Sequence, residues 1–125
     1  MISIIKSIKS FQYAFKGVWY FFKEENNARI HLIASIVVTA AGFYFEISVA
    51  EWLWITLAIG LVWMAEAFNT AIEKLVDFVS PGFDKRAGEI KDLAAGAVIF
   101  AAIVALVIGI LIFKSHFIDL WVDNF

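Results

Sequence analysis

The segment from Leu93 to Phe113 contains no charged residue, and it constrains the fold more than any other feature of this sequence. A helix of about 20 apolar residues crosses the roughly 30 Å hydrocarbon core of a bilayer. The apolar character extends over the whole chain, because 62% of its 125 residues are hydrophobic. A soluble domain of this length has too little interior to bury that fraction. The sequence therefore predicts an all-α integral membrane protein.

Two further segments have the composition of membrane-spanning helices. No full charge occurs from Ile30 to Phe45, and the chain from Trp52 to Met64 is also largely apolar. Ser80-Pro81-Gly82 ends the second of these helices, because Pro lacks the backbone donor and Gly permits a turn. We expect three spans, at about residues 29–47, 52–79 and 89–113. With no linker in between, residues 1–125 are predicted to form a single membrane-embedded domain.

The N-terminal residues 1 to about 27 are predicted to form an amphipathic helix in the membrane interface. Apolar side chains recur there at helical spacing, and the lysines lie mostly off that stripe. Basic residues also decide the orientation, because cytoplasmic segments of membrane proteins are rich in Lys and Arg. The N-terminus and the loop at residues 80–91 are therefore expected in the cytoplasm and the C-terminus outside. The basic residues on the cytoplasmic side are Lys6, Lys9, Lys16, Lys23, Arg29, Lys74, Lys85, Arg86 and Lys91.

Composition excludes several kinds of function. A net charge of −2 argues against nucleic acid as a partner. The absence of cysteine excludes disulfides, thiolate metal sites and thiol catalysis. The sequence contains no G-x-x-x-x-G-K-[ST], G-x-G-x-x-G or G-x-S-x-G motif. The function must therefore lie in polar residues that these signatures do not describe.

Four polar residues, Glu66, Asn69, Glu73 and Asp77, are spaced by three or four and share one face of the second predicted span. Glu66 lies about 14 residues beyond Trp52, which places it roughly 21 Å into a core of about 30 Å. An ionisable group at that depth costs at least about 2.5 kcal/mol, so Glu66 is a functional candidate. The alternative is that these residues only hydrogen-bond neighbouring helices.

Complementary groups lie on the same side of the membrane. Glu25 to His31 precede the first span, and Lys91-Asp92 opens the third. Carboxylates there can hold Mg²⁺, and Lys91 can neutralise a phosphate, although a snorkelling lysine is the simpler interpretation of that residue alone. The residues predict an interfacial site for a metal and an anion. A small transporter or ion-coupled channel that uses Glu66 as a buried ionisable site remains an alternative, as does a non-catalytic membrane partner.

The motifs carry a resemblance to a known family. Glu66-Ala67-Phe68-Asn69-Thr70-Ala71-Ile72-Glu73, continuing to Asp77, resembles the E-x-x-N-[ST]-A-[IV]-E-x-x-x-D signature of the small prokaryotic diacylglycerol kinases. Lys91 to Val98 resembles their K-D-x-x-[AS]-[AG]-A-V segment, and the similarity extends from about residue 6 to residue 113. The resemblance implies a homotrimer of three-span chains in the bacterial inner membrane. Such a kinase transfers the γ-phosphoryl group of ATP to a lipid hydroxyl.

The resemblance also implies roles for individual residues. Glu66 would be the general base, and Glu25 and Glu73 would hold Mg²⁺. Lys6 and Arg29 would face the lipid together with Glu66. The residues implied to surround ATP are Tyr13, Gly17, Glu25, Asn69, Glu73, Asp77, Gly88, Lys91 and Asp92.

Three positions bear on how the chain fits within that family. Asp84 stands near the position where many members have a histidine, so the resemblance does not extend a nucleotide contact to residues 82–84. Lys6 stands where diacylglycerol-specific members tend to have arginine. The Asn27-x-Arg29-Ile30-His31 pattern resembles the undecaprenol kinase branch. These features favour undecaprenol over diacylglycerol as the acceptor.

Overall fold

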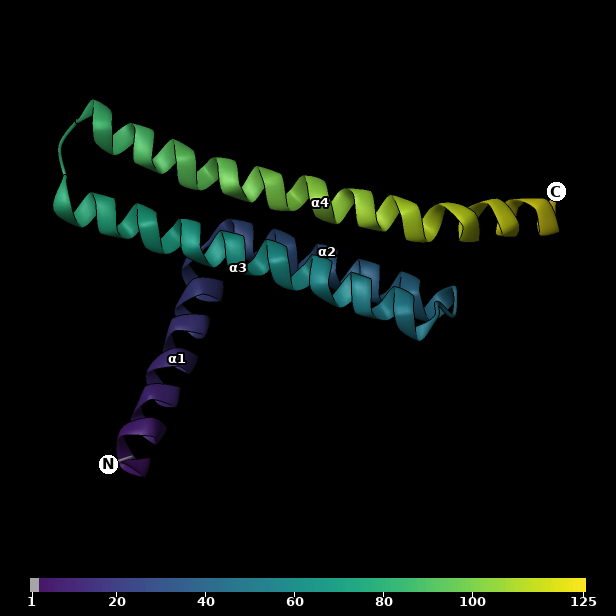
Figure 1. Ribbon diagram of the computed structural model, residues 1–125, viewed down its shortest axis with the longest axis horizontal. Helices are drawn as coiled ribbons and strands as arrows, with labels where there is room; N and C mark the ends of the chain where they lie inside the picture. Colours follow the sequence, from purple (N-terminus) through teal and green to yellow (C-terminus); the bar gives the residue numbers. More distant parts are fainter. Residues whose placement is uncertain (1–2) are drawn as a thin grey trace.

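Four α-helices make up the part of the chain that the structure describes, residues 3–125 of a computed structural model (Figure 1). They are α1 (Ile4–Glu24), α2 (Asn26–Tyr44), α3 (Val49–Val79) and α4 (Lys85–Asn124). Residues 1 and 2, the predicted beginning of the interfacial helix, lie outside the described residues. The all-helical prediction is confirmed.

The helices form a bundle of three with one helix leaving it. α3 and α4 lie antiparallel along each other, α2 lies beside α3, and α1 runs away from the bundle (Figure 1). The junction between α1 and α2 and the loop between α3 and α4 are therefore at one end of the bundle. The turn between α2 and α3 and the C-terminus are at the other end.

The junction between α1 and α2 differs from the predicted helix end at about residue 27. Glu25 has an extended backbone (φ −104°, ψ 118°), so α1 ends at Glu24 and a new helix begins at Asn26. The Arg29 guanidinium donates a hydrogen bond of 2.9 Å from Nη2 to the carbonyl oxygen of Lys23. Carbonyls at a helix C-terminus lack intrahelical partners, so this contact stabilises the break.

The turn between α2 and α3 is held by a capping box and by a close helix contact. The Ser48 hydroxyl accepts from the backbone N–H of Glu51, and the Glu51 carboxylate accepts from the backbone N–H of Ser48. Gly42 packs against the Trp52 ring, and a Cβ at Gly42 would lie 2.5 Å from a Trp52 carbon. Glycine is thus required at this position because only hydrogen fits there.

The interior of the single chain is small, and its surface is largely apolar. No large side chain among residues 3–125 is completely buried, whereas Leu93, Phe100 and Leu111 are exposed along α4. An apolar surface of this extent suits lipid or neighbouring helices rather than water. α3 and α4 are long and apolar enough to cross a membrane. α2 is less apolar than these two helices and does not qualify as a span by composition, since its first turns contain Asn26, Asn27, Arg29 and His31.

α4 is longer than the predicted third span at residues 89–113. Its 40 residues extend about 60 Å at 1.5 Å per residue, roughly twice the thickness of the hydrocarbon core. The helix continues without interruption through Lys114 to Asn124, because the final turns contain no Pro or Gly to stop it. The aromatic residues of the tail, Phe117, Trp121 and Phe125, are exposed on this continuation.

Gly42→Ala is expected to lower the free energy of unfolding by about 1–3 kcal/mol, because the new methyl group overpacks the contact with Trp52. Gly60→Ala is the matched control, since a Cβ at Gly60 meets no atom within 4 Å. Thermal unfolding in detergent, followed by circular dichroism, measures both variants. Equal midpoints for the two variants would contradict the importance of this helix contact.

Candidate active site

The polar row predicted on the second span lies on α3 and becomes less buried along the helix. Glu66, Asn69 and Thr70 are buried, with Glu66 only 5% exposed. Glu73 is half-buried and Asp77 is exposed. The row therefore leads from the interior of the bundle toward the end that holds the loop between α3 and α4.

The buried Glu66 carboxylate has a partner on α2. His31 Nε2 lies 2.9 Å from Glu66 Oε1, and the two side chains are 25% and 6% exposed. Burial of a carboxylate is costly unless it is hydrogen-bonded, so this contact stabilises Glu66 in place. His31 is not among the site residues predicted from the sequence. The available signal was that His31 is the one histidine at the start of a segment without full charges.

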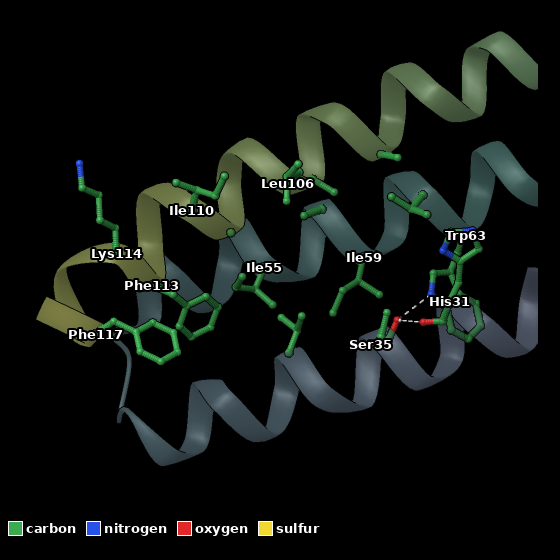
Figure 2. A pocket seen from close by; sticks show the side chains of 17 residues that line it. His31, Ser35, Ile55, Ile59, Trp63, Leu106, Ile110, Phe113, Lys114 and Phe117 are labelled. Atoms are coloured by element: carbon green, nitrogen blue, oxygen red, sulfur yellow. Dashed lines mark hydrogen bonds between the residues drawn. The ribbon is translucent and has the colours of Figure 1, made fainter. Parts of the chain in front are cut away.

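A second polar link between α2 and α3 lies one turn from the first. The Trp63 indole N–H donates to Ser35 Oγ at 2.9 Å, and the Ser35 hydroxyl donates to the carbonyl oxygen of His31 at 2.7 Å (Figure 2). The Phe22 ring at the end of α1 packs on Trp63, with 4.8 Å between ring centroids. Three helices therefore meet close to the His31–Glu66 pair.

An apolar cavity of about 540 Å³ extends from this point between α2, α3 and α4 (Figure 2). His31, Ser35 and Trp63 line one end, and Phe113 and Phe117 line the other. The wall between them consists of Ala, Val, Ile, Leu and Gly residues. A cavity with these walls suits hydrocarbon.

Beyond Glu66, charged and amide groups pair within α3 and between α3 and α4. The Asn69 amide donates to Glu73 Oε1 of the same helix at 3.4 Å. The Lys91 ammonium of α4 donates to the Asp77 carboxylate of α3. Asn69 Oδ1 is buried and has no hydrogen-bond partner among residues 3–125. An unpaired buried acceptor is rare in folded proteins, so Asn69 Oδ1 keeps an acceptor capacity that the described residues do not use.

A preformed metal cage is not part of this site. No group of three or more His, Asp or Glu residues within residues 3–125 is arranged to hold a metal ion. Glu25 and Glu73, the predicted Mg²⁺ ligands, are both half-buried. Mg²⁺ commonly binds one or two carboxylates and completes its shell with phosphate and water. Two carboxylates agree in number and chemistry with an Mg²⁺ ion that arrives with a nucleotide.

Other predicted site residues lie on α1 or at helix starts. Tyr13 and Gly17 are exposed on α1, which runs away from the row on α3 (Figure 1). Lys6 is exposed in the first turns of α1, whereas Arg29 caps the end of that helix. Within one chain, these residues do not join the α3 row. Gly88 and Asp92 are exposed on the first turns of α4.

Asp84 holds the start of α4. Its carboxylate accepts from the Arg86 backbone N–H at 2.8 Å and pairs with the Arg86 guanidinium at 3.3 Å. The Arg86 side chain and then its backbone N–H hold the pKa of Asp84 below its ordinary value. In this structure Asp84 is a helix cap.

Comparison with known proteins identifies the family. Residues 12–113 match the family described as prokaryotic diacylglycerol kinase. An undecaprenol kinase of Bacillus subtilis (strain 168) is 41% identical over 105 residues, which cover 84% of this chain and 85% of that protein. A diacylglycerol kinase of Synechocystis sp. is 38% identical, covering 80% of this chain and 58% of that protein. The diacylglycerol kinase of Escherichia coli (strain K12) is 26% identical, covering 88% and 90%.

The chain therefore belongs to the prokaryotic diacylglycerol kinase family. It is a lipid kinase, an enzyme that transfers a phosphoryl group to a lipid alcohol. This assignment favours the kinase over the transporter or channel that the residues alone left open.

Asp84→Ala is expected to lower the thermal midpoint near neutral pH, because α4 loses its cap and its pair with Arg86. A carboxylate whose folded-state pKa is depressed stabilises the fold above its unfolded-state pKa. That stabilisation is lost as pH falls through the lower folded-state pKa. The midpoints of the two proteins should thus differ most above the ordinary Asp value of 3.8 and converge below it. A difference that stays constant with pH would contradict the role of the charged form.

Proposed function

We propose that this lipid kinase phosphorylates undecaprenol with ATP and that Glu66 is the general base. The observation that carries the proposal is the burial of Glu66 in an apolar helix, where it is 5% exposed and pairs with His31, a residue that lines an apolar cavity. Such surroundings favour a lipid hydroxyl over a water-soluble substrate as the group that meets the carboxylate. A general base must lie within hydrogen-bond reach of the proton that it removes, and the lipid hydroxyl is proposed to approach from the side of this cavity.

The proposed reaction is a direct phosphoryl transfer. Glu66 accepts the proton of the lipid hydroxyl, and the hydroxyl oxygen forms a bond to the γ-phosphorus. The bond from that phosphorus to the β,γ-bridging oxygen breaks, and ADP leaves with the electron pair. Transfers of this kind depend mainly on positioning and charge neutralisation. They need no P-loop, and this chain has no such motif.

The nucleotide is proposed to bind at the exposed end of the α3 row. Mg²⁺ bound with ATP would neutralise phosphate charge, and Glu25 and Glu73 would hold it. Lys91 pairs with Asp77, which lies one helical turn beyond Glu73 on α3, and is proposed to supply positive charge to the phosphates. The unpaired Asn69 Oδ1 supports a ligand from outside the chain at this position. The further residues proposed to contact ATP are Tyr13, Gly17, Gly88 and Asp92.

We propose that the active unit is a homotrimer. Tyr13 and Gly17 of one chain lie away from its own α3 row, so a neighbouring chain is a natural source of facing groups. The extensive exposed apolar surface supports helix contacts of this kind. α2 is proposed as a third span of the bacterial inner membrane. The α1–α2 junction and the loop at residues 80–91 are then in the cytoplasm, and the C-terminus is outside.

The choice of acceptor rests on the relatives. The Bacillus subtilis protein named undecaprenol kinase is 41% identical, compared with 38% and 26% for the diacylglycerol kinases of Synechocystis sp. and Escherichia coli. The apolar cavity supports a long hydrocarbon substituent but does not separate the two lipids, because both have one. Lys6 and Arg29 are proposed to act on the lipid side. Diacylglycerol is the second candidate acceptor.

Glu66→Gln is expected to lower kcat roughly 10²- to 10⁴-fold, because the amide cannot accept the hydroxyl proton. Glu51→Gln is the matched control, since Glu51 is also on α3 and also pairs with a histidine, His116, but at the far end of the bundle. Turnover of purified protein with ATP, Mg²⁺ and lipid measures both variants. Undiminished activity of Glu66→Gln would exclude Glu66 as the base.

Undecaprenol and diacylglycerol in competition are expected to give mainly undecaprenyl phosphate. Mass spectrometry of lipids that carry labelled γ-phosphate identifies the product. Mainly phosphatidic acid would reverse the order of the two acceptors, and a labelled lipid of neither kind would exclude both.

A further inference from the structure

We propose that His31 is a positioning residue for Glu66, an inference that rests on the proposed role of Glu66 as the base. The two residues come from different helices and are 35 positions apart, yet His31 Nε2 lies 2.9 Å from Glu66 Oε1. The Glu66 side chain is 6% exposed. Few water molecules can therefore compete for this carboxylate, and the imidazole sets its direction.

A flexible glutamate needs such a partner to act as a base. Its side chain has several rotatable bonds, and the productive distance to the proton is only about 2.6–3.2 Å. A displacement of about 1 Å can reduce the rate roughly 10²-fold. The histidine engages Oε1, which leaves Oε2 as the oxygen that accepts the proton. His31 also lines the end of the apolar cavity, so the imidazole lies between Glu66 and the place where we expect the hydrocarbon of the lipid.

His31 is itself held by the adjacent link. Ser35 accepts from the Trp63 indole and donates to the His31 carbonyl oxygen (Figure 2). Trp63 and Glu66 are three residues apart on α3, and His31 and Ser35 are four residues apart on α2. Residues at these spacings lie on the same face of a helix. This second link fixes α2 against α3 at the height where the imidazole meets the carboxylate.

The opposite end of the bundle provides an internal comparison. His116 Nε2 lies 3.1 Å from Glu51 Oε2, between α4 and α3. That histidine has the same 25% side-chain exposure as His31, but its carboxylate is 27% exposed and also caps α3. The two His–Glu pairs are thus alike in chemistry and differ in the burial of the carboxylate. Substitution of His116 measures the general effect of losing such a pair.

The test compares His31→Leu, His31→Gln and His116→Leu in the full-length protein in lipid or detergent. His31→Leu is expected to lower kcat roughly 10- to 100-fold while KM for ATP stays unchanged, because only the direction of the carboxylate is lost. His31→Gln is expected to retain kcat within about 3-fold, since its amide N–H can donate to Glu66. His116→Leu is expected to change kcat less than about 2-fold. Thermal midpoints are measured in parallel.

A double-mutant cycle with Glu66→Gln separates positioning from folding. If His31 acts through Glu66, His31→Leu has no further effect on the residual rate of Glu66→Gln. An equal effect in both backgrounds, or parallel losses of activity and stability in His31→Leu and His31→Gln, would overturn the positioning role. Full activity of His31→Leu beside an impaired Glu66→Gln would refute His31 and leave the base in place. Full activity of Glu66→Gln would remove the base and, with it, this inference.

Discussion

The structure depends on keeping one carboxylate inside an apolar helix bundle. Glu66 is nearly inaccessible, and an ionisable group there raises the free energy of the fold unless another polar group meets it. The only residue of α2 that meets it is His31. This requirement ties the rotation and height of α2 to those of α3. Near this pair, the end of α1 also contacts α3, because Phe22 packs on Trp63.

The same chemistry has different consequences at two places along α3. In the first turn, Glu51 has a side chain that is 27% exposed, caps the helix through Ser48 and pairs with His116 of α4. In the middle of the helix, the Glu66 carboxylate is buried, and its partner His31 lines an apolar cavity. Burial rather than residue type makes the second pair suited to chemistry, since a dry environment strengthens electrostatic contacts and favours a lipid over water.

A single chain leaves part of its chemistry unsatisfied. Asn69 Oδ1 has no partner among residues 3–125, and much of the apolar surface of α3 and α4 is exposed. The residues expected to contact ATP are divided between α1 and the α3–α4 pair, which diverge (Figure 1). These observations have one explanation in common. All of them agree with the proposed homotrimer, in which a neighbouring chain and the membrane would cover these groups.

The all-helical class, the apolar character of α3 and α4, and the polar row on α3 all follow from the amino-acid sequence alone. These features are local, because residues three or four apart share a helix face whatever surrounds the helix. The sequence also contained the motifs of the family. The helix break at Glu25, the extension of α4 to Asn124 and the pairing of His31 with Glu66 came only from the structure. At Glu25 the extended backbone lies between Lys23 and Arg29, which are joined by a hydrogen bond across the helix break. A contact between two helices depends on how each helix is rotated and how far it is shifted along the other. Side-chain packing sets these two quantities, and the spacing of residues in the sequence does not specify them.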